Sequence, residues 1–170
     1  MIRDGVVESL TPGTGHAADE GRSPALRAAS LALAVPRRAA LTGLAALWVH
    51  GWEGGSAAPP LLEVAVRRGC HPGAPKGTDS LDWAFVTDQA TCRSATVVGG
   101  VLVADAPHAA AAALARGSLA PAIGALLWAV TQALIDPKMF EATLLESTFG
   151  GNQLRARSAW DAACEAIGAR

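Results

Sequence analysis

The middle third of the chain alternates apolar and polar positions with the period of a β-strand. In the run Leu62–Arg67, every second residue is Leu or Val, which is typical of a strand buried on one face. Trp83 and Phe85 mark a second strand of the same kind. Gly99–Gly100 separates two valine-rich runs and predicts a hairpin, because paired glycines accept the positive φ angles of a two-residue turn. These patterns predict a small sheet.

Helix signals come before this sheet. Ser23 is a favourable N-cap, and a proline follows it at the first helical position, so a helix is expected to begin there and to end by Pro36. Thr42 is the predicted cap of a short helix over Gly43–His50, which Gly51 ends.

The last third of the chain is predicted to be helical. Asp105 and Asp136 are predicted caps, the first opening an alanine-rich helix that runs to Arg116. Between these two helices, a helical repeat of large aliphatic residues predicts a buried stripe: Ile123, Leu126, Leu127, Val130 and Leu134. The last helix is expected to bury Ala156, Trp160, Ala163, Cys164 and Ile167, and to expose an Arg157–Asp161 pair.

These elements predict an α+β fold: a small, mostly antiparallel sheet packed with Ala-rich helices, and a helical C-terminal half. Residues 1–21 are interpreted as a wing-like strand remnant followed by a loose segment, in which His16 is solvated. Residues 22–170 are interpreted as one α+β domain.

Composition and charge exclude several classes of function. Of the 170 residues, 51% are hydrophobic and 17% are charged, and the formal net charge is −1, so a globular domain is expected. The basic residues occur at most in pairs, such as Arg37–Arg38 and Arg67–Arg68, which makes the chain a poor nucleic-acid binder. No signal peptide is predicted. The uncharged run 117–135 contains Pro, Gly, Gln and many Ala, which favours a buried helix over a membrane span. The chain is therefore expected to be a cytoplasmic protein.

Candidate chemistry is sparse. Cys70, His71 and Cys92, with His50, lack the paired spacing of zinc ligands, so no metal site is predicted. No residue is predicted to be catalytic or to bind a cofactor. The alternative hypothesis is a small metal- or ligand-binding, enzyme-like domain that uses Cys70, His71, Cys92 and Asp82.

One aromatic cluster has two interpretations. Trp48, His50 and Trp52 either pack in the core or form a partner-binding patch, since Trp and Arg are common interface anchors. In the second interpretation, Arg67 and Arg68 form the rim of the patch. A further alternative is a homo-oligomeric structural protein, in which Trp128 lies on the less buried face of its helix.

Three segments together resemble the C-terminal domain of AbiEi-type antitoxins, the regulatory components of type IV toxin–antitoxin systems. They are "TGLAALWVHGW" (42–52), "LLEVAVRRGCHPG" (61–73) and "GGVLVADAPHAAAAALAR" (99–116). The resemblance spans residues 20–165. It implies a non-catalytic regulatory domain that contacts a protein partner, namely a nucleotidyltransferase-like toxin.

The chain departs from this family in two places. The family's N-terminal winged helix is missing, and only a wing-like "RDGVVESLTPG" (3–13) is present, so DNA binding is expected only through the missing part. The family also has Arg and Asp at the positions of Ala109 and Ala113, which share one helical face. Their loss fits either a structural ion pair replaced by apolar packing or a degenerate partner site.

Overall fold

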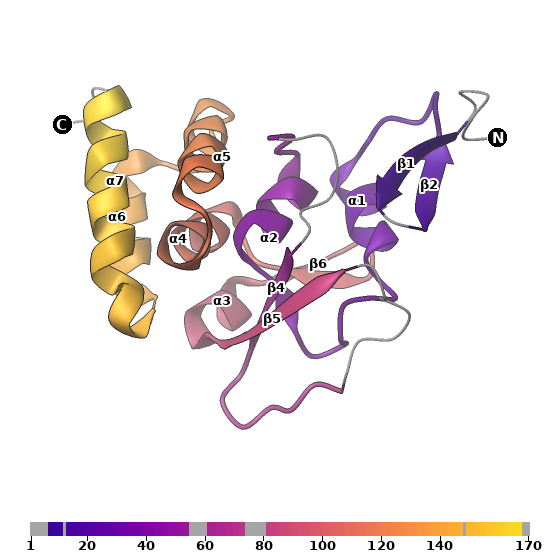
Figure 1. Ribbon diagram of the computed structural model, residues 1–170, viewed down its shortest axis with the longest axis horizontal. Helices are drawn as coiled ribbons and strands as arrows, with labels where there is room; N and C mark the ends of the chain where they lie inside the picture. The colour runs from indigo at the N-terminus through magenta and orange to yellow at the C-terminus, as the bar shows by residue number, and fades with distance from the viewer. Residues whose placement is uncertain (1–6, 12, 55–60, 74–80, 148, 168–170) are drawn as a thin grey trace.

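A five-stranded mixed sheet lies at the middle of the molecule, and helices pack beside it (Figure 1). The computed structural model describes residues 7–11, 13–54, 61–73, 81–147 and 149–167. The strands of this sheet are β3 (Ala40–Leu41), β4 (Leu61–Val66), β5 (Asp82–Thr87), β6 (Thr96–Val98) and β7 (Val101–Val103). Their order is β5-β4-β3-β7-β6, with β3/β4 and β6/β7 antiparallel and β3/β7 and β4/β5 parallel. Strands β1 (Val7–Thr11) and β2 (Thr14–Ala17) form a separate antiparallel hairpin.

The helices are concentrated in the second half of the chain. They are α1 (Pro24–Ser30), α2 (Gly43–His50), α3 (Gln89–Ser94), α4 (Ala106–Arg116), α5 (Leu119–Thr131), α6 (Pro137–Glu146) and α7 (Gln153–Ile167), with a short 3₁₀ turn at Gly150–Asn152. Figure 1 shows α5, α6 and α7 on the side of the molecule away from the β1–β2 hairpin. The predicted α+β class is confirmed.

Helix α4 is the centre of the core. It contacts α2, α3, α5, α6 and α7, and its residues from Ala109 to Ala115 are buried, each at most 1% exposed. The alanine content of α4 allows this central place, because a side chain of one methyl group lets neighbouring helices approach from every direction. The long alanine run is therefore a packing feature.

The local signals for turns and caps are confirmed, except that the side chain of Thr42, before α2, makes no capping hydrogen bond. The side chains of Ser23, Asp105 and Asp136 each accept a hydrogen bond from the first turn of the helix that follows. Gly99 and Gly100 have φ angles of +53° and +84° in the β6–β7 turn. A Cβ atom at Gly99 would lie 2.2 Å from the carbonyl oxygen of Ala25, so this turn also requires glycine for space.

Helix α5 is oriented differently from the prediction. Its buried residues are Ala122, Ala125, Leu126 and Ala129. Of the predicted stripe, Ile123, Leu127 and Val130 are half-buried and Leu134 is 41% exposed. The reason is that α5 packs against α4, and the alanine face of α5 fits the alanine surface of α4 more closely than branched side chains would.

Other expectations are corrected. His16 was expected in a solvated loop, but it lies in β2 and is 6% exposed. Arg157 pairs with Glu141 of α6 at 3.1 Å. Strand β3 and helix α3 were not predicted, since each is too short to show a period. Residues 55–60 and 74–80 and the side chain of Ile167 lie outside the described residues.

Candidate functional site

Trp48 belongs to the core. Its side chain is 5% exposed, and the guanidinium of Arg27 stacks over the indole ring at 5.3 Å from the ring centroid. The core-packing interpretation therefore applies to Trp48, which presents almost no surface to a partner.

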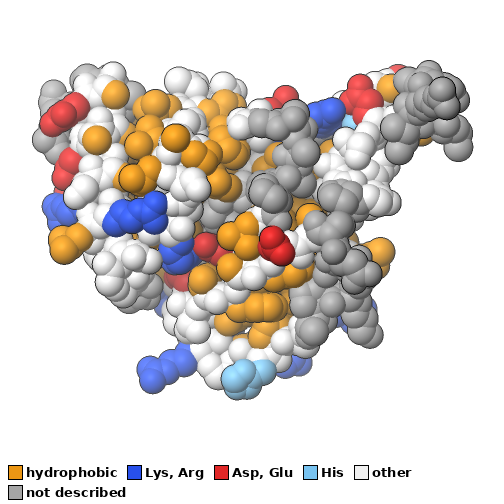
Figure 2. Space-filling view, viewed as in Figure 1, with side chains coloured by type: hydrophobic (Ala, Val, Ile, Leu, Met, Phe, Trp, Pro, Cys, Tyr) orange, Lys and Arg blue, Asp and Glu red, His pale blue; other side chains and the backbone are white. Residues whose placement is uncertain are grey.

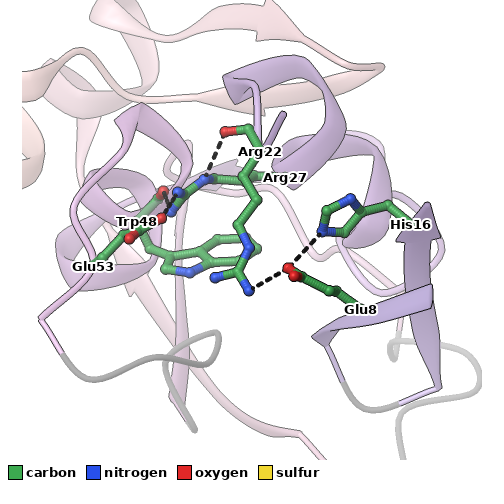
Figure 3. Close-up of polar contacts among 6 residues, drawn as sticks. All are labelled: Glu8, His16, Arg22, Arg27, Trp48 and Glu53. Atoms are coloured by element: carbon green, nitrogen blue, oxygen red, sulfur yellow. Dashed lines mark hydrogen bonds and ion pairs between the residues drawn. The ribbon is translucent and has the colours of Figure 1, made fainter. Parts of the chain in front are cut away.

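Arg27 is the centre of a polar cluster that holds the first two helices together (Figure 3). Its side chain is 4% exposed. Nη1 donates to the Trp48 carbonyl at 3.0 Å, Nε donates to the Arg22 carbonyl at 3.2 Å, and Nη2 pairs with Glu53. Arg22 in turn pairs with Glu8 of β1 at 3.0 Å, which links the β1–β2 hairpin to this cluster. No periodic pattern in the sequence predicts a buried arginine at this position.

His50 and Trp52 also have structural contacts. Nε2 of His50 lies 2.7 Å from the carbonyl oxygen of Ala104, which joins the end of α2 to the segment before α4. Trp52 is half-buried, and its amide donates to the Leu47 carbonyl at 3.0 Å, so the chain turns back after Gly51. Of the three clustered residues, Trp48 is buried, whereas His50 and Trp52 are both half-buried.

Arg67 and Arg68 are exposed after β4. Arg67 lines a hollow of about 480 Å³ that contains neither Trp48 nor Trp52 in its lining. The lining residues are Arg37, Arg38, Ala40, Arg67, Cys70, Cys92, Arg93, Ala95 and Leu102. Of the two predicted rim residues, only Arg67 lines this hollow, in which the fold gathers arginines from separate parts of the chain.

The proposed enzyme-like residues are only partly brought together. Cys70 and Cys92 line the same hollow, whereas His71 and Asp82 are exposed. Burial raises the pKa of the Cys92 thiol, Asp88 adds to this effect, and Arg67 opposes it. A raised pKa favours the protonated thiol, which is a poor nucleophile. Within the described part of the chain, no group of three or more His, Cys, Asp or Glu side chains is placed to hold a metal ion.

Asp105 and His108 form an ion pair at the start of α4. Nδ1 of His108 lies 2.7 Å from Oδ1 of Asp105, which also accepts the His108 amide at 3.0 Å. Burial by itself would raise the pKa of Asp105, but the hydrogen bonds from His108 outweigh it and lower that pKa. Burial also disfavours protonated His108, yet the hydrogen bond and charge of Asp105, with the charges of Asp88 and Glu146, raise the pKa of His108.

Replacing His108 with Gln is expected to remove a pH-dependent part of the free energy of unfolding. The raised His108 pKa contributes stability that is fully present below the unfolded value of about 6.5 and is lost as pH rises through the folded value. The lowered Asp105 pKa contributes stability that is present above the unfolded value of about 3.9 and is lost as pH falls through the folded value. The contribution is therefore largest between about pH 4 and pH 6.5.

Urea unfolding of the wild type and His108→Gln at several pH values measures this difference. His71→Gln, at an exposed histidine, is the control. If the difference in free energy of unfolding between the wild type and His108→Gln stays constant from about pH 5 to pH 8, the stabilising role of the Asp105–His108 pair is contradicted.

Ala109 and Ala113 lie in the interior. Ala109 is fully buried and Ala113 is 1% exposed, both on α4. A side chain at either position faces neighbouring helices and not solvent. The geometry therefore favours apolar packing over a degenerate partner site.

Helix α5 presents an apolar surface. We call Leu119, Ala120, Ile123, Gly124 and Leu127 the α5 outer face. Leu119 is 43% exposed, Ala120 and Gly124 are exposed, and Ile123 and Leu127 are half-buried. Figure 2 shows apolar side chains gathered over this helix. Trp128 is half-buried, and a Cβ atom at Gly51 would lie 3.4 Å from its ring.

A second apolar feature lies at the edge of the sheet. In the described residues β5 pairs only with β4. Trp83 and Phe85 stack on it with ring centroids 6.3 Å apart, and Phe85 is 45% exposed.

None of the described helices is both long enough and apolar enough to cross a membrane. Comparisons of the chain with models of protein families, with curated proteins and with solved structures found no match.

Proposed function

We propose that this domain is a non-catalytic protein-binding module that acts as the antitoxin-like component of a two-protein system. The proposed partner is the nucleotidyltransferase-like protein that the resemblance to AbiEi-type antitoxins implies. The single observation that carries the proposal is the α5 outer face, an uncharged surface that includes Leu119, Ile123 and Leu127.

The uncharged character of this helix supports the proposal. No charged residue occurs between Arg116 and Asp136. A helix with one side towards solvent usually carries charged or polar residues on that side. Contiguous apolar surface on a soluble domain marks an interaction site more often than isolated apolar residues do. Small residues, here Ala120 and Gly124, let a partner helix approach the backbone closely.

The interior of the domain supports a binding role from another direction. The groups with shifted pKa values serve structural contacts: Asp105 caps α4, and His108 pairs with it. Cys92 is held towards its protonated form. The buried polar groups of the fold therefore stabilise its helices, and the proposed binding role is assigned to its surface.

Replacing Ile123 and Leu127 together with Lys is expected to abolish co-purification with the product of the adjacent gene when both proteins are expressed together. Two lysines would put charge at the centre of an apolar contact, where desolvation is unfavourable. The matched control replaces Met139 and Leu145 on α6 with Lys, because these side chains are 64% and 65% exposed. Circular dichroism of each variant checks that its helices remain folded.

Three outcomes contradict the proposal. The first is that the product of the adjacent gene does not co-purify with the wild type. The second is that the α5 and α6 variants lose co-purification equally. The third is that co-purification is lost only on Phe85→Lys, which would place the contact at the β5 edge. Light scattering separates the homo-oligomer alternative, since a stable dimer of the wild type that the α5 variant abolishes would make the α5 outer face a self-association surface.

A further inference from the structure

The hollow beside β3 and β4 concentrates positive charge. Arg37 and Arg38 precede β3, Arg67 follows β4, and Arg93 lies on α3, yet all four line one hollow. No Asp or Glu is among its lining residues. A domain with a formal net charge of −1 therefore carries a strongly positive concavity.

These arginines are not used by ion pairs of the described fold. The arginines that do pair with carboxylates in the described residues are Arg22, Arg27, Arg116 and Arg157. Asp88 lies close to Cys92, which lines the hollow, but Asp88 itself is fully buried and is not part of the lining. Its oxygens accept hydrogen bonds from the amide and the hydroxyl of Thr91 at 3.1 and 2.8 Å. Four like charges around one hollow repel one another, and an anion bound between them would relieve this repulsion.

The size and lining of the hollow indicate which class of ligand it fits. A volume of about 480 Å³ is in the range of small-molecule sites. Guanidinium groups bind phosphate oxygens through paired hydrogen bonds. Ala40, Ala95 and Leu102 add an apolar part to the lining, which suits a ligand with an organic group beside its anionic end.

The sheet places the hollow at a favourable end of the strands. Strands β4 and β5 are parallel, and Arg67 directly follows the last residue of β4. Helix α3 follows β5, and both Cys92 and Arg93 lie on it. In sheets with parallel strands, ligands commonly bind beyond the carboxyl ends of those strands.

We propose that this hollow binds a small phosphorylated molecule, with Arg37, Arg38, Arg67 and Arg93 holding the phosphoryl group. The site is separate from the α5 outer face and does not depend on the proposed partner. It is a binding site, and no covalent step is assigned to it.

Calorimetric titration of the full chain with pyrophosphate and with adenosine monophosphate tests the proposal. We expect saturable binding of at least one probe, weakened at least about tenfold, or about 1.4 kcal/mol, by the double substitution Arg67→Gln and Arg93→Gln. Arg68→Gln is the matched control, because Arg68 is also exposed after β4 but does not line the hollow. Tighter binding of the nucleotide assigns the apolar part of the lining to the organic group, and tighter binding of pyrophosphate assigns an inorganic ligand.

Thiol protection gives a second readout. Cys70 and Cys92 line the hollow, whereas Cys164 is buried in α7. A bound probe is expected to slow alkylation of Cys70 and Cys92 and to leave that of Cys164 unchanged. The proposal is overturned if neither probe binds up to about 10 mM, if Arg68→Gln weakens binding as much as the double variant, or if alkylation of all three cysteines slows equally.

Discussion

Replacing Ala109 with Arg is expected to lower the free energy of unfolding by at least about 4 kcal/mol, a large part of the 5–15 kcal/mol typical of a domain. Ala109 is fully buried on α4, the helix that contacts five others. An arginine there either buries a charge without a partner or separates α4 from its neighbours, and both are strongly unfavourable. Urea unfolding followed by tryptophan fluorescence measures the change.

The matched control is Ala162→Arg, at an exposed position of α7, where the change is expected to be within about 0.5 kcal/mol. If Ala109→Arg unfolds at the same urea concentration as the wild type, the described packing of α4 is contradicted. The double variant Ala109→Arg and Ala113→Asp restores the residues that the resemblance expects. It should recover only part of the stability, since both side chains enter a core already filled.

Replacing Arg27 with Ala is expected to lower the free energy of unfolding by about 3 kcal/mol. The substitution removes the hydrogen bond to the buried Trp48 carbonyl, the stacking over the Trp48 ring and the pair with Glu53. Each contact to a charged group contributes about 1–3 kcal/mol. The Glu53 contribution is discounted, because that side chain is 55% exposed.

Arg68→Ala is the control for Arg27→Ala, since Arg68 is exposed. Trp48 fluorescence should also shift on Arg27→Ala, because water gains access to the ring. An Arg27→Ala variant as stable as the wild type would show that the cluster in Figure 3 does not hold α1 against α2.

Signals confined to a few neighbouring residues predicted much of the fold. The Gly99–Gly100 turn, the caps Ser23 and Asp105, and the bounds of α2 are all found in the structure. Such features depend on φ angles and on hydrogen bonds within one turn, which the local sequence determines.

The orientation of α5 shows why the remainder was harder to predict. Hydrophobic spacing alone favours burial of Ile123, Leu127 and Val130, because it ranks residues by hydrophobicity. The structure buries the alanine face instead, since the facing surface of α4 is itself alanine. The shape of a partner helix decides such a case, and a single helix does not reveal it.

The arginine-lined hollow was missed for a related reason. Arg37, Arg67 and Arg93 lie on separate elements, so the sequence shows only scattered basic residues. They meet because β3 pairs with β4 and because α3 packs on β4. Similarly, Trp48 and Arg67 lie on different features, although the predicted partner-binding patch placed them together.

Calorimetric titration of the domain with the product of the adjacent gene measures whether α5 carries the partner interface. With Ile123→Lys and Leu127→Lys together, we expect binding at least about 100-fold weaker than that of the wild type. With Met139→Lys and Leu145→Lys on α6, we expect a Kd within about threefold of the wild type. An unchanged Kd for the α5 variant, in a chain that remains folded, would contradict the claim that the domain binds its partner through the α5 outer face.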